Sequence, residues 1–174
     1  MENILDQLAL ASRRAPGSRV FQILRNDDLP RLYAFFRTFD FDQRRAYFGG
    51  GVSDQSIHDY CHGIEWSHTT VIARSGPYCI EAIATLASLP PDRAVAELSV
   101  GCPLSCDQRP IIAELLNLAT EIAAPACRAL LVRRELAHPD LLSLLRAHAH
   151  ARFDDETARI DLAASGRAKT AAAR

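Results

Sequence analysis

The first part of the chain carries apolar residues at helical spacing. Asn26-Asp27-Asp28 supplies capping side chains ahead of an apolar stripe that begins at Leu29. Further along, Gly49-Gly50-Gly51 is typical of a flexible joint between helices, and Gly63 is typical of a helix end. These signals predict a strand at residues 19–24, followed by helices that begin at residue 29, at residue 41 (ending at 48) and at residue 53 or 54 (ending near 62).

From residue 69 the pattern changes to that of strands. Two β-rich runs flank Ser75-Gly76-Pro77, a tight-turn signal, and so predict an antiparallel hairpin. The elements expected here are strands at residues 69–74, 78–88, 94–100, 128–132 and 157–162, and helices at residues 107–123 and 139–149. Antiparallel strands followed by a β-α-β unit predict an α+β fold, with a mixed, mostly antiparallel sheet and helices on both faces.

Length and composition indicate one domain. The chain has 174 residues, of which 48% are hydrophobic, and this is enough to bury a single core. We expect the domain at residues 19–164, after an N-terminal extension at residues 1–18. Residues 165–174 are small and polar, which predicts a disordered tail.

Charge and hydropathy argue against two classes of partner. Twenty basic residues against twenty-one acidic ones give a net charge of -1, which supplies no attractive field for nucleic acid. The apolar stretch at residues 123–136 is interrupted by arginines and is shorter than the ~20 residues that cross a membrane. No apolar run follows Ser12-Arg13-Arg14, as it would in an export signal. We therefore expect a cytoplasmic protein.

The cysteines are sparse and odd in number. Five cysteines in a chain of this length differ from the dense, even sets of small secreted domains, so we expect reduced thiols. Cys102 and Cys106 have three residues between them and no second pair nearby, which argues against structural zinc. A redox pair stays an open alternative.

The stretch after the strand at residues 94–100 points to a family. The strand ends at Val100, and the stretch comprises Gln108, Arg109, Pro110, Ile111, Ile112 and Ala113. Together with the order of elements over residues 19–162, it resembles the GNAT superfamily, whose fourth strand is followed by Gln/Arg-x-x-Gly-x-Gly/Ala. The resemblance implies that these residues bind the pyrophosphate of acetyl-CoA or another acyl-CoA. It also implies a small-molecule or peptide amine as acceptor, and it is compatible with a homodimer.

The physical chemistry of this turn predicts a weakened anion site. A helix N-terminus attracts an anion through its unpaired N–H groups and its dipole. Pro110 lacks an N–H donor, however, and the β-branched Ile111 stands where the pattern has glycine. Arg109 can add a charge-assisted hydrogen bond, whereas Asp107 repels phosphate unless it caps the helix. An alignment one residue earlier places Pro110 and Ile112 on the glycine positions. Weak or absent cofactor binding is expected.

Two further positions bear on catalysis. Aligned on His138, the family pattern has a proton-donating tyrosine where this chain has Leu145, so His148 and His150 are the nearest candidates in sequence for a proton donor. Glu97 matches a glutamate that deprotonates the amine in some relatives and is the candidate catalytic base. The alternative is that Glu97 points to solvent and pairs with a neighbouring strand residue.

Other constellations have simpler interpretations. His58 and His62 have the spacing of two metal ligands on one helix face, but no third ligand is evident, so surface histidines are expected and no metal site. Trp66 and the cluster of Phe35, Phe36, Phe39 and Phe41 are interpreted as core or anchoring residues.

Two functional hypotheses remain. The first is an acyl-CoA-dependent N-acyltransferase in which an amine attacks the thioester directly, with Glu97 as base. The second is a non-catalytic GNAT-like domain that senses a ligand or binds a protein, because a fold does not fix a function. An open cleft after the strand at residues 94–100 would favour acyl-CoA binding, and a filled one would exclude it.

Overall fold

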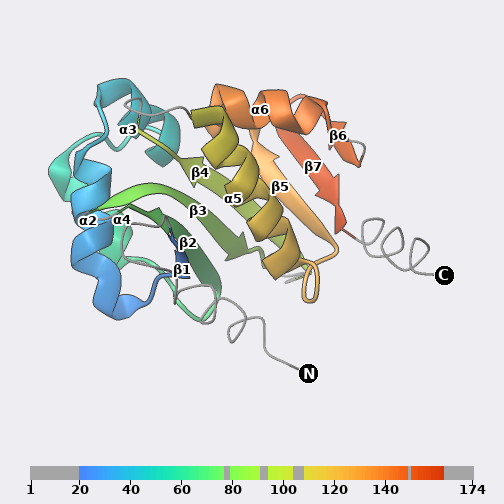
Figure 1. The fold of residues 1–174 in the computed structure, drawn as a ribbon. Coiled ribbons are helices and arrows are strands. Elements are labelled where there is room, and N and C mark those ends of the chain that lie inside the picture. Colours follow the sequence, from blue (N-terminus) through green and yellow to red (C-terminus); the bar gives the residue numbers. More distant parts are fainter. Residues whose placement is uncertain (1–19, 77–78, 91–93, 104–107, 149, 163–174) are drawn as a thin grey trace.

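A mixed β-sheet lies at the centre of the computed structural model, which describes residues 20–76, 79–90, 94–103, 108–148 and 150–162 (Figure 1). Its strands are β1 (Val20–Ile23), β2 (Thr69–Ser75), β3 (Ile80–Ser88), β4 (Val95–Gly101), β5 (Ala129–Arg133), β6 (Ala151–Phe153) and β7 (Thr157–Asp161). They lie in the order β1-β2-β3-β4-β5-β7-β6, and among the described strands only β4 and β5 are parallel neighbours. The predicted mixed, mostly antiparallel sheet is confirmed.

Helices cover both faces of this sheet, also as predicted. They are α2 (Leu29–Arg37), α3 (Phe41–Phe48), α4 (Asp54–His62), α5 (Gln108–Ala123) and α6 (Pro139–Arg146), with short 3-10 turns η1 (Asn26–Asp28) and η2 (Arg134–Leu136). One core cluster lies under α5 and α6, and a second lies between α2, α4 and the strands β2 and β3 (Figure 1). No helix in the described ranges is long and apolar enough to cross a membrane.

Short sequence signals fix the two helices that flank the end of β4. Asp40 and Gln43 form a capping box at the start of α3, since each side chain accepts a hydrogen bond from the backbone N–H of the other. Gly49 ends α3 with a φ of 67°, a left-handed conformation that favours glycine. His138 caps α6, and Pro139 occupies a first-turn position where its missing N–H costs nothing.

Some short elements and one side chain differ from the sequence predictions, and two predicted segments lie outside the residues that the structure describes. η1, η2 and β6 were not predicted, because three residues are too few to show a period. Phe41 was expected in the aromatic core and this is wrong: its side chain is 61% exposed, because it opens α3 beside the cap. The N-terminal extension at residues 1–18 and the tail at residues 165–174 lie outside the described residues.

Candidate functional site

β4 and β5 separate toward their C-terminal ends. They pair at Val95–Ala129, Ala96–Leu130 and Glu97–Leu131, whereas β4 continues to Gly101 and β5 to Arg133. Beyond Glu97, the described residues of β4 pair only with β3. Backbone N–H and C=O groups of residues 98–101 that face away from β3 therefore have no strand partner, although buried backbone groups need one.

A cavity of about 240 Å³ lies where this gap widens. Its walls come from the α2–α3 connection and α3, from the end of β4, and from the junction between η2 and α6. The lining residues are Phe39, Asp40, Asp42, Gln43, Ala46, Tyr47, Val100, Gly101, Cys102, Leu136, Ala137, His138 and Pro139. The cleft after β4 is therefore not filled by the side chains of the described residues.

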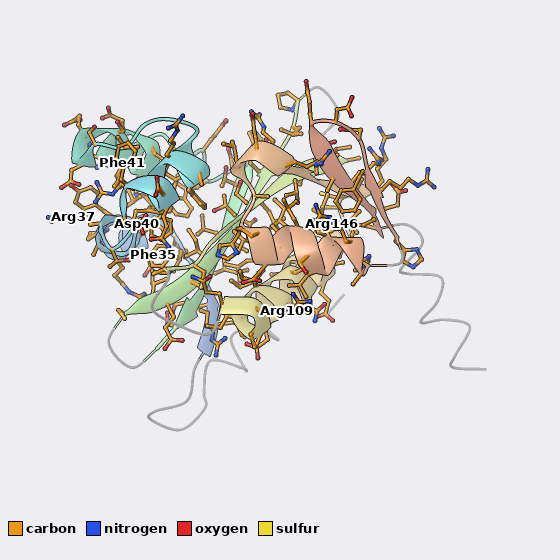
Figure 2. The ribbon with its side chains drawn as sticks, turned by 90° about the horizontal axis from the view of Figure 1, so that it is seen from above. Phe35, Arg37, Asp40, Phe41, Arg109 and Arg146 are labelled. Atoms are coloured by element: carbon orange, nitrogen blue, oxygen red, sulfur yellow. The ribbon has the colours of Figure 1, made fainter. Side chains whose placement is uncertain are left out.

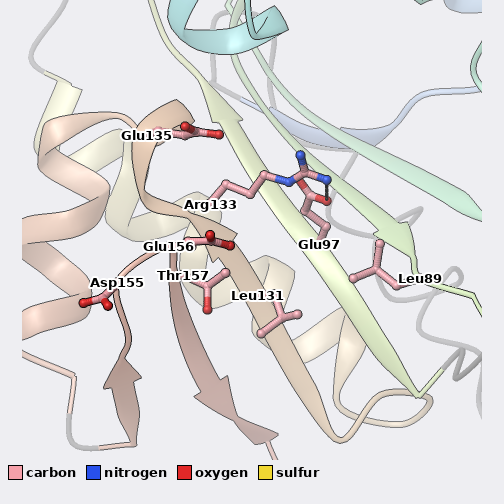
Figure 3. A pocket seen from close by; sticks show the side chains of 8 residues that line it. All are labelled: Leu89, Glu97, Leu131, Arg133, Glu135, Asp155, Glu156 and Thr157. Carbon is pink, nitrogen blue, oxygen red and sulfur yellow. Dashed lines mark hydrogen bonds and ion pairs between the residues drawn. The ribbon is translucent and has the colours of Figure 1, made fainter.

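Glu97 lies at the last paired position, where the two strands begin to separate. Its carboxylate accepts a hydrogen bond from Nη2 of Arg133 on β5 (Nη2–Oε2 3.3 Å) and forms an ion pair with Nε of the same guanidinium (Nε–Oε1 3.0 Å) (Figure 3). Both residues line a cavity of about 470 Å³, together with Glu135, Asp155 and Glu156 among others. Glu97 thus combines the two alternatives, because it faces a cavity and also pairs with a neighbouring strand residue.

The three cavities share lining residues and so are neighbours, and together they are called the groove below. A third hollow of about 660 Å³ shares Arg133 and Glu135 with the cavity at Glu97. The same hollow shares Asp42, Ala46 and Leu136 with the cavity at the gap. The groove therefore runs from the carboxylate of Glu97, past α3, to the end of β4. Two reactants can meet in such a groove.

The apolar members of the predicted pyrophosphate turn are mostly core residues. Val100, Ile111 and Ile112 are 6%, 4% and 0% exposed and belong to the cluster under α5. Ala113 is half-buried and Pro110 is exposed. The side chain of Ile111 therefore points into the core and not toward the helix surface, where a phosphate would lie.

The polar members of the turn are engaged within the protein. Gln108 donates from Nε2 to the carbonyl oxygens of Cys102 and Pro103, at 3.4 and 2.9 Å. The exposed Arg109 donates from Nη1 to Oγ of Ser143 at 2.9 Å, on the side of the molecule formed by α5 and α6 (Figure 2). Of the two, only Arg109 has a charged group that can turn to a phosphate.

The residues expected to replace the family's tyrosine lie elsewhere. Leu145 is fully buried and carries no proton to donate. His148 and His150, with ring centroids 5.9 Å apart, follow α6 and line none of the three cavities. His138 does line the cavity at the gap, and sequence reasoning used it only as an alignment point. Burial lowers the pKa of its imidazole, against the opposing effect of Asp140.

Aromatic rings fill the face of the sheet beneath this groove. Phe36 contacts the rings of Phe35, Phe39, Tyr47, Phe48 and Tyr60, with centroids 4.9 to 5.5 Å away. The hydroxyl of Tyr47 lies 3.0 Å from Oγ1 of Thr85 on β3. Burial raises the pKa of both Tyr47 and Tyr60, so both phenols stay protonated at neutral pH.

The remaining described candidates, His58, His62, Trp66 and Cys61, line none of the three cavities. The ring centroids of His58 and His62 lie 4.1 Å apart, and the described residues contain no group of three or more metal-binding side chains. Trp66 packs against the second core cluster, as expected of an anchoring indole. Burial raises the pKa of Cys61 to about 11, so its thiol stays protonated at neutral pH, while Cys106 lies outside the described residues.

Gly101 allows the aromatic rings to pack directly on β4, which predicts a cost for adding a side chain there. A Cβ at Gly101 would lie 2.9 Å from Cζ of Phe39 and 3.1 Å from Cε2 of Tyr47. We expect Gly101→Ala to lower the free energy of unfolding in urea by about 1 to 3 kcal/mol, as overpacking does. Adding Phe39→Leu should recover part of that loss in a double-mutant cycle. An unchanged stability of Gly101→Ala would show that the rings yield freely.

Comparisons with known proteins identify the architecture. No family model matches the sequence, and no curated protein matches it. The GNAT domain of S. lividans PAT matches with a TM-score of 0.61 at 16% identity, over 83% of this chain and 89% of that chain. YncA of Salmonella typhimurium, solved with its cofactor acetyl-CoA, matches with a TM-score of 0.62 at 10% identity, over 83% and 94% of the two chains. PaiA N-acetyltransferase of Thermoplasma acidophilum, in complex with coenzyme A, matches with a TM-score of 0.56 at 12% identity, over 83% and 99%. This chain therefore has the GNAT fold that its sequence resembles.

Proposed function

We propose that this chain binds an acyl-coenzyme A between β4 and β5 and transfers the acyl group to an amine. The observation that carries the proposal is the separation of the two parallel strands beyond Glu97 and Leu131, with a cavity of about 240 Å³ at the opening. YncA and PaiA share the fold and were solved with acetyl-CoA and coenzyme A. Their ligands support the same class of donor here.

The described residues fit an extended arm that contains amide groups. Backbone groups of residues 98–101 have no partner on the side of the gap. An inserted chain can pair with them in the manner of an added strand. The exposed Arg109 lies in the first described turn of α5, where its guanidinium can leave Ser143 and bind a phosphate. Pro110 offers no N–H, which lowers the affinity expected for the phosphates.

Glu97 supplies the base in this proposal. A protonated amine in the cavity of about 470 Å³ must lose a proton before it attacks a thioester, and the carboxylate lies on that cavity. The amine competes with Arg133 for the carboxylate oxygens. Because the Arg133 side chain is 56% exposed, its release into water costs little.

A second candidate function is acyl-CoA binding without transfer, in a ligand-sensing or protein-interaction domain. Two observations favour it. Both oxygens of Glu97 are engaged by Arg133, and Leu145 is a buried core residue where the family has a proton donor. The two functions share the donor site and differ in turnover, so binding and product formation must be measured separately.

Blocking the gap should weaken donor binding. Ala46 is exposed on α3 and lines two of the three cavities, so a tryptophan there can fill the groove without entering the core. We expect Ala46→Trp to weaken desulfo-coenzyme A binding by about tenfold or more in titration calorimetry. Its free energy of unfolding should change by less than about 0.5 kcal/mol.

The matched control is Ala34→Trp, which places the same side chain on an exposed position of α2 outside the cavities. It should bind desulfo-coenzyme A like the wild type. Equal binding by both variants would place the ligand elsewhere, and no binding by the wild type would remove the basis of both candidate functions.

A further inference from the structure

His138 lines the cavity at the gap, and its cap of α6 uses only one of its two ring nitrogens. The imidazole Nδ1 accepts the backbone N–H of Asp140 at 3.2 Å, as the cap of α6. A neutral imidazole that accepts at Nδ1 carries its proton on Nε2. Burial lowers the pKa of His138, which keeps the ring neutral at pH 7. Nε2 has no hydrogen-bond partner within the described parts of the chain.

The other polar groups on this cavity are occupied or negatively charged. The amide of Gln43 donates to the carbonyl of Cys102, and the hydroxyl of Tyr47 bonds with Thr85. The charged side chains on the lining are Asp40, which caps α3, and Asp42 in the first turn of α3; Asp140 faces the imidazole, with an oxygen 3.9 Å from Nδ1. An anion formed here meets carboxylates on α3 and α6, and, among the described lining side chains, one nitrogen donor without a protein acceptor, Nε2 of His138, besides the backbone N–H groups that face the gap.

We propose that His138 stabilises the leaving thiolate of coenzyme A in the reaction proposed above, by donating its Nε2–H to the sulfur. The inference rests on the proposed function. As the amine nitrogen bonds to the acyl carbon, the carbon–sulfur bond breaks and its electron pair stays on sulfur. Of the two protons that the ammonium loses, one goes to Glu97 and then to solvent, and one neutralises the sulfur. His138 remains neutral throughout: it stabilises the thiolate by a hydrogen bond and transfers no proton itself, unlike the tyrosine of the family pattern, which Leu145 replaces.

The test compares coenzyme A with desulfo-coenzyme A, which differ only at the sulfur. Titrations of the full chain with a phosphine reductant, which keeps the five thiols from forming mixed disulfides, are run from pH 7 to 9. A donor to sulfur favours the thiolate. We therefore expect wild-type protein to prefer coenzyme A by about tenfold at the upper end of this range. The ultraviolet absorbance of the bound thiolate should rise at lower pH than that of free coenzyme A.

Two variants separate the donor from the cap. His138→Ser keeps a capping oxygen for Asp140 but cannot reach the cavity, whereas His138→Ala loses both. His138→Ser should bind desulfo-coenzyme A like the wild type, keep its stability and lose the preference for coenzyme A. A preference that survives in His138→Ser, or equal binding of both ligands by the wild type, overturns the inference and leaves the proposed function standing. Failure of the wild type to bind desulfo-coenzyme A refutes both.

Discussion

Phe36→Ala should lower the free energy of unfolding by about 3 to 5 kcal/mol, the range for removing a fully buried aromatic ring. Phe36 is 0% exposed, and its ring touches five other aromatic rings that come from α2, the α2–α3 connection, α3 and α4. These contacts hold α3 against the sheet, and α3 forms one wall of the groove. Urea unfolding followed by circular dichroism measures the loss.

Phe41→Ala is the matched control, because it removes the same side chain five residues further along. Phe41 is 61% exposed, so its truncation should change the free energy of unfolding by less than about 0.5 kcal/mol. If the two variants lose equal stability, the aromatic cluster is not the centre of the second core. Because α3 lines the groove, Phe36→Ala should also weaken desulfo-coenzyme A binding in a protein that is still folded, while Phe41→Ala should not.

The parts of the fold with strong local signals could be predicted from the sequence. Helix α3 begins at residue 41 and ends at residue 48, as expected, because Asp40 and Gln43 cap its start and Gly49 can adopt the left-handed conformation that ends it. The hairpin of β2 and β3 follows from two β-rich runs on either side of a turn signal. β6 could not be predicted, since three residues at a sheet edge are ordered by pairing with β7 rather than by their own pattern.

The site could be predicted less completely, because its key relations join residues that are distant in sequence. The pairing of Glu97 with Arg133 depends on two strands lying side by side, and no spacing rule connects positions so far apart. The donor on His138 depends on which ring nitrogen caps α6. The side chain of Ile111 is part of the core, whereas Pro110 is exposed and lacks an N–H, so we expect Pro110 more than Ile111 to weaken the turn toward a phosphate.

Glu97→Gln should lower the rate of amine acylation by about 100- to 10,000-fold, the usual contribution of a general base, if the proposed acyl transfer is correct. Glutamine keeps the size of the side chain and can still accept a hydrogen bond from Arg133, so stability and desulfo-coenzyme A affinity should hold. Product is best measured by mass spectrometry of the acylated amine, because thiol reagents would react with the protein's own five cysteines.

Glu135→Gln tests whether the loss of rate in Glu97→Gln comes from the position of that carboxylate or only from its negative charge. Glu135 is an exposed carboxylate on the same cavity, so this variant removes the same charge but leaves Glu97, where β4 and β5 begin to separate, unchanged. It should stay within a few-fold of the wild-type rate, because a base must lie within reach of the proton it takes.

Arg133→Gln should lower the KM for the amine, since the acceptor then finds Glu97 unpaired. Equal losses in Glu97→Gln and Glu135→Gln would reduce the role of Glu97 to general attraction of a cation. Measurable donor binding with no product from the wild type or from Arg133→Gln, across primary amines and peptides, would instead favour the domain that binds an acyl-CoA without transferring its acyl group.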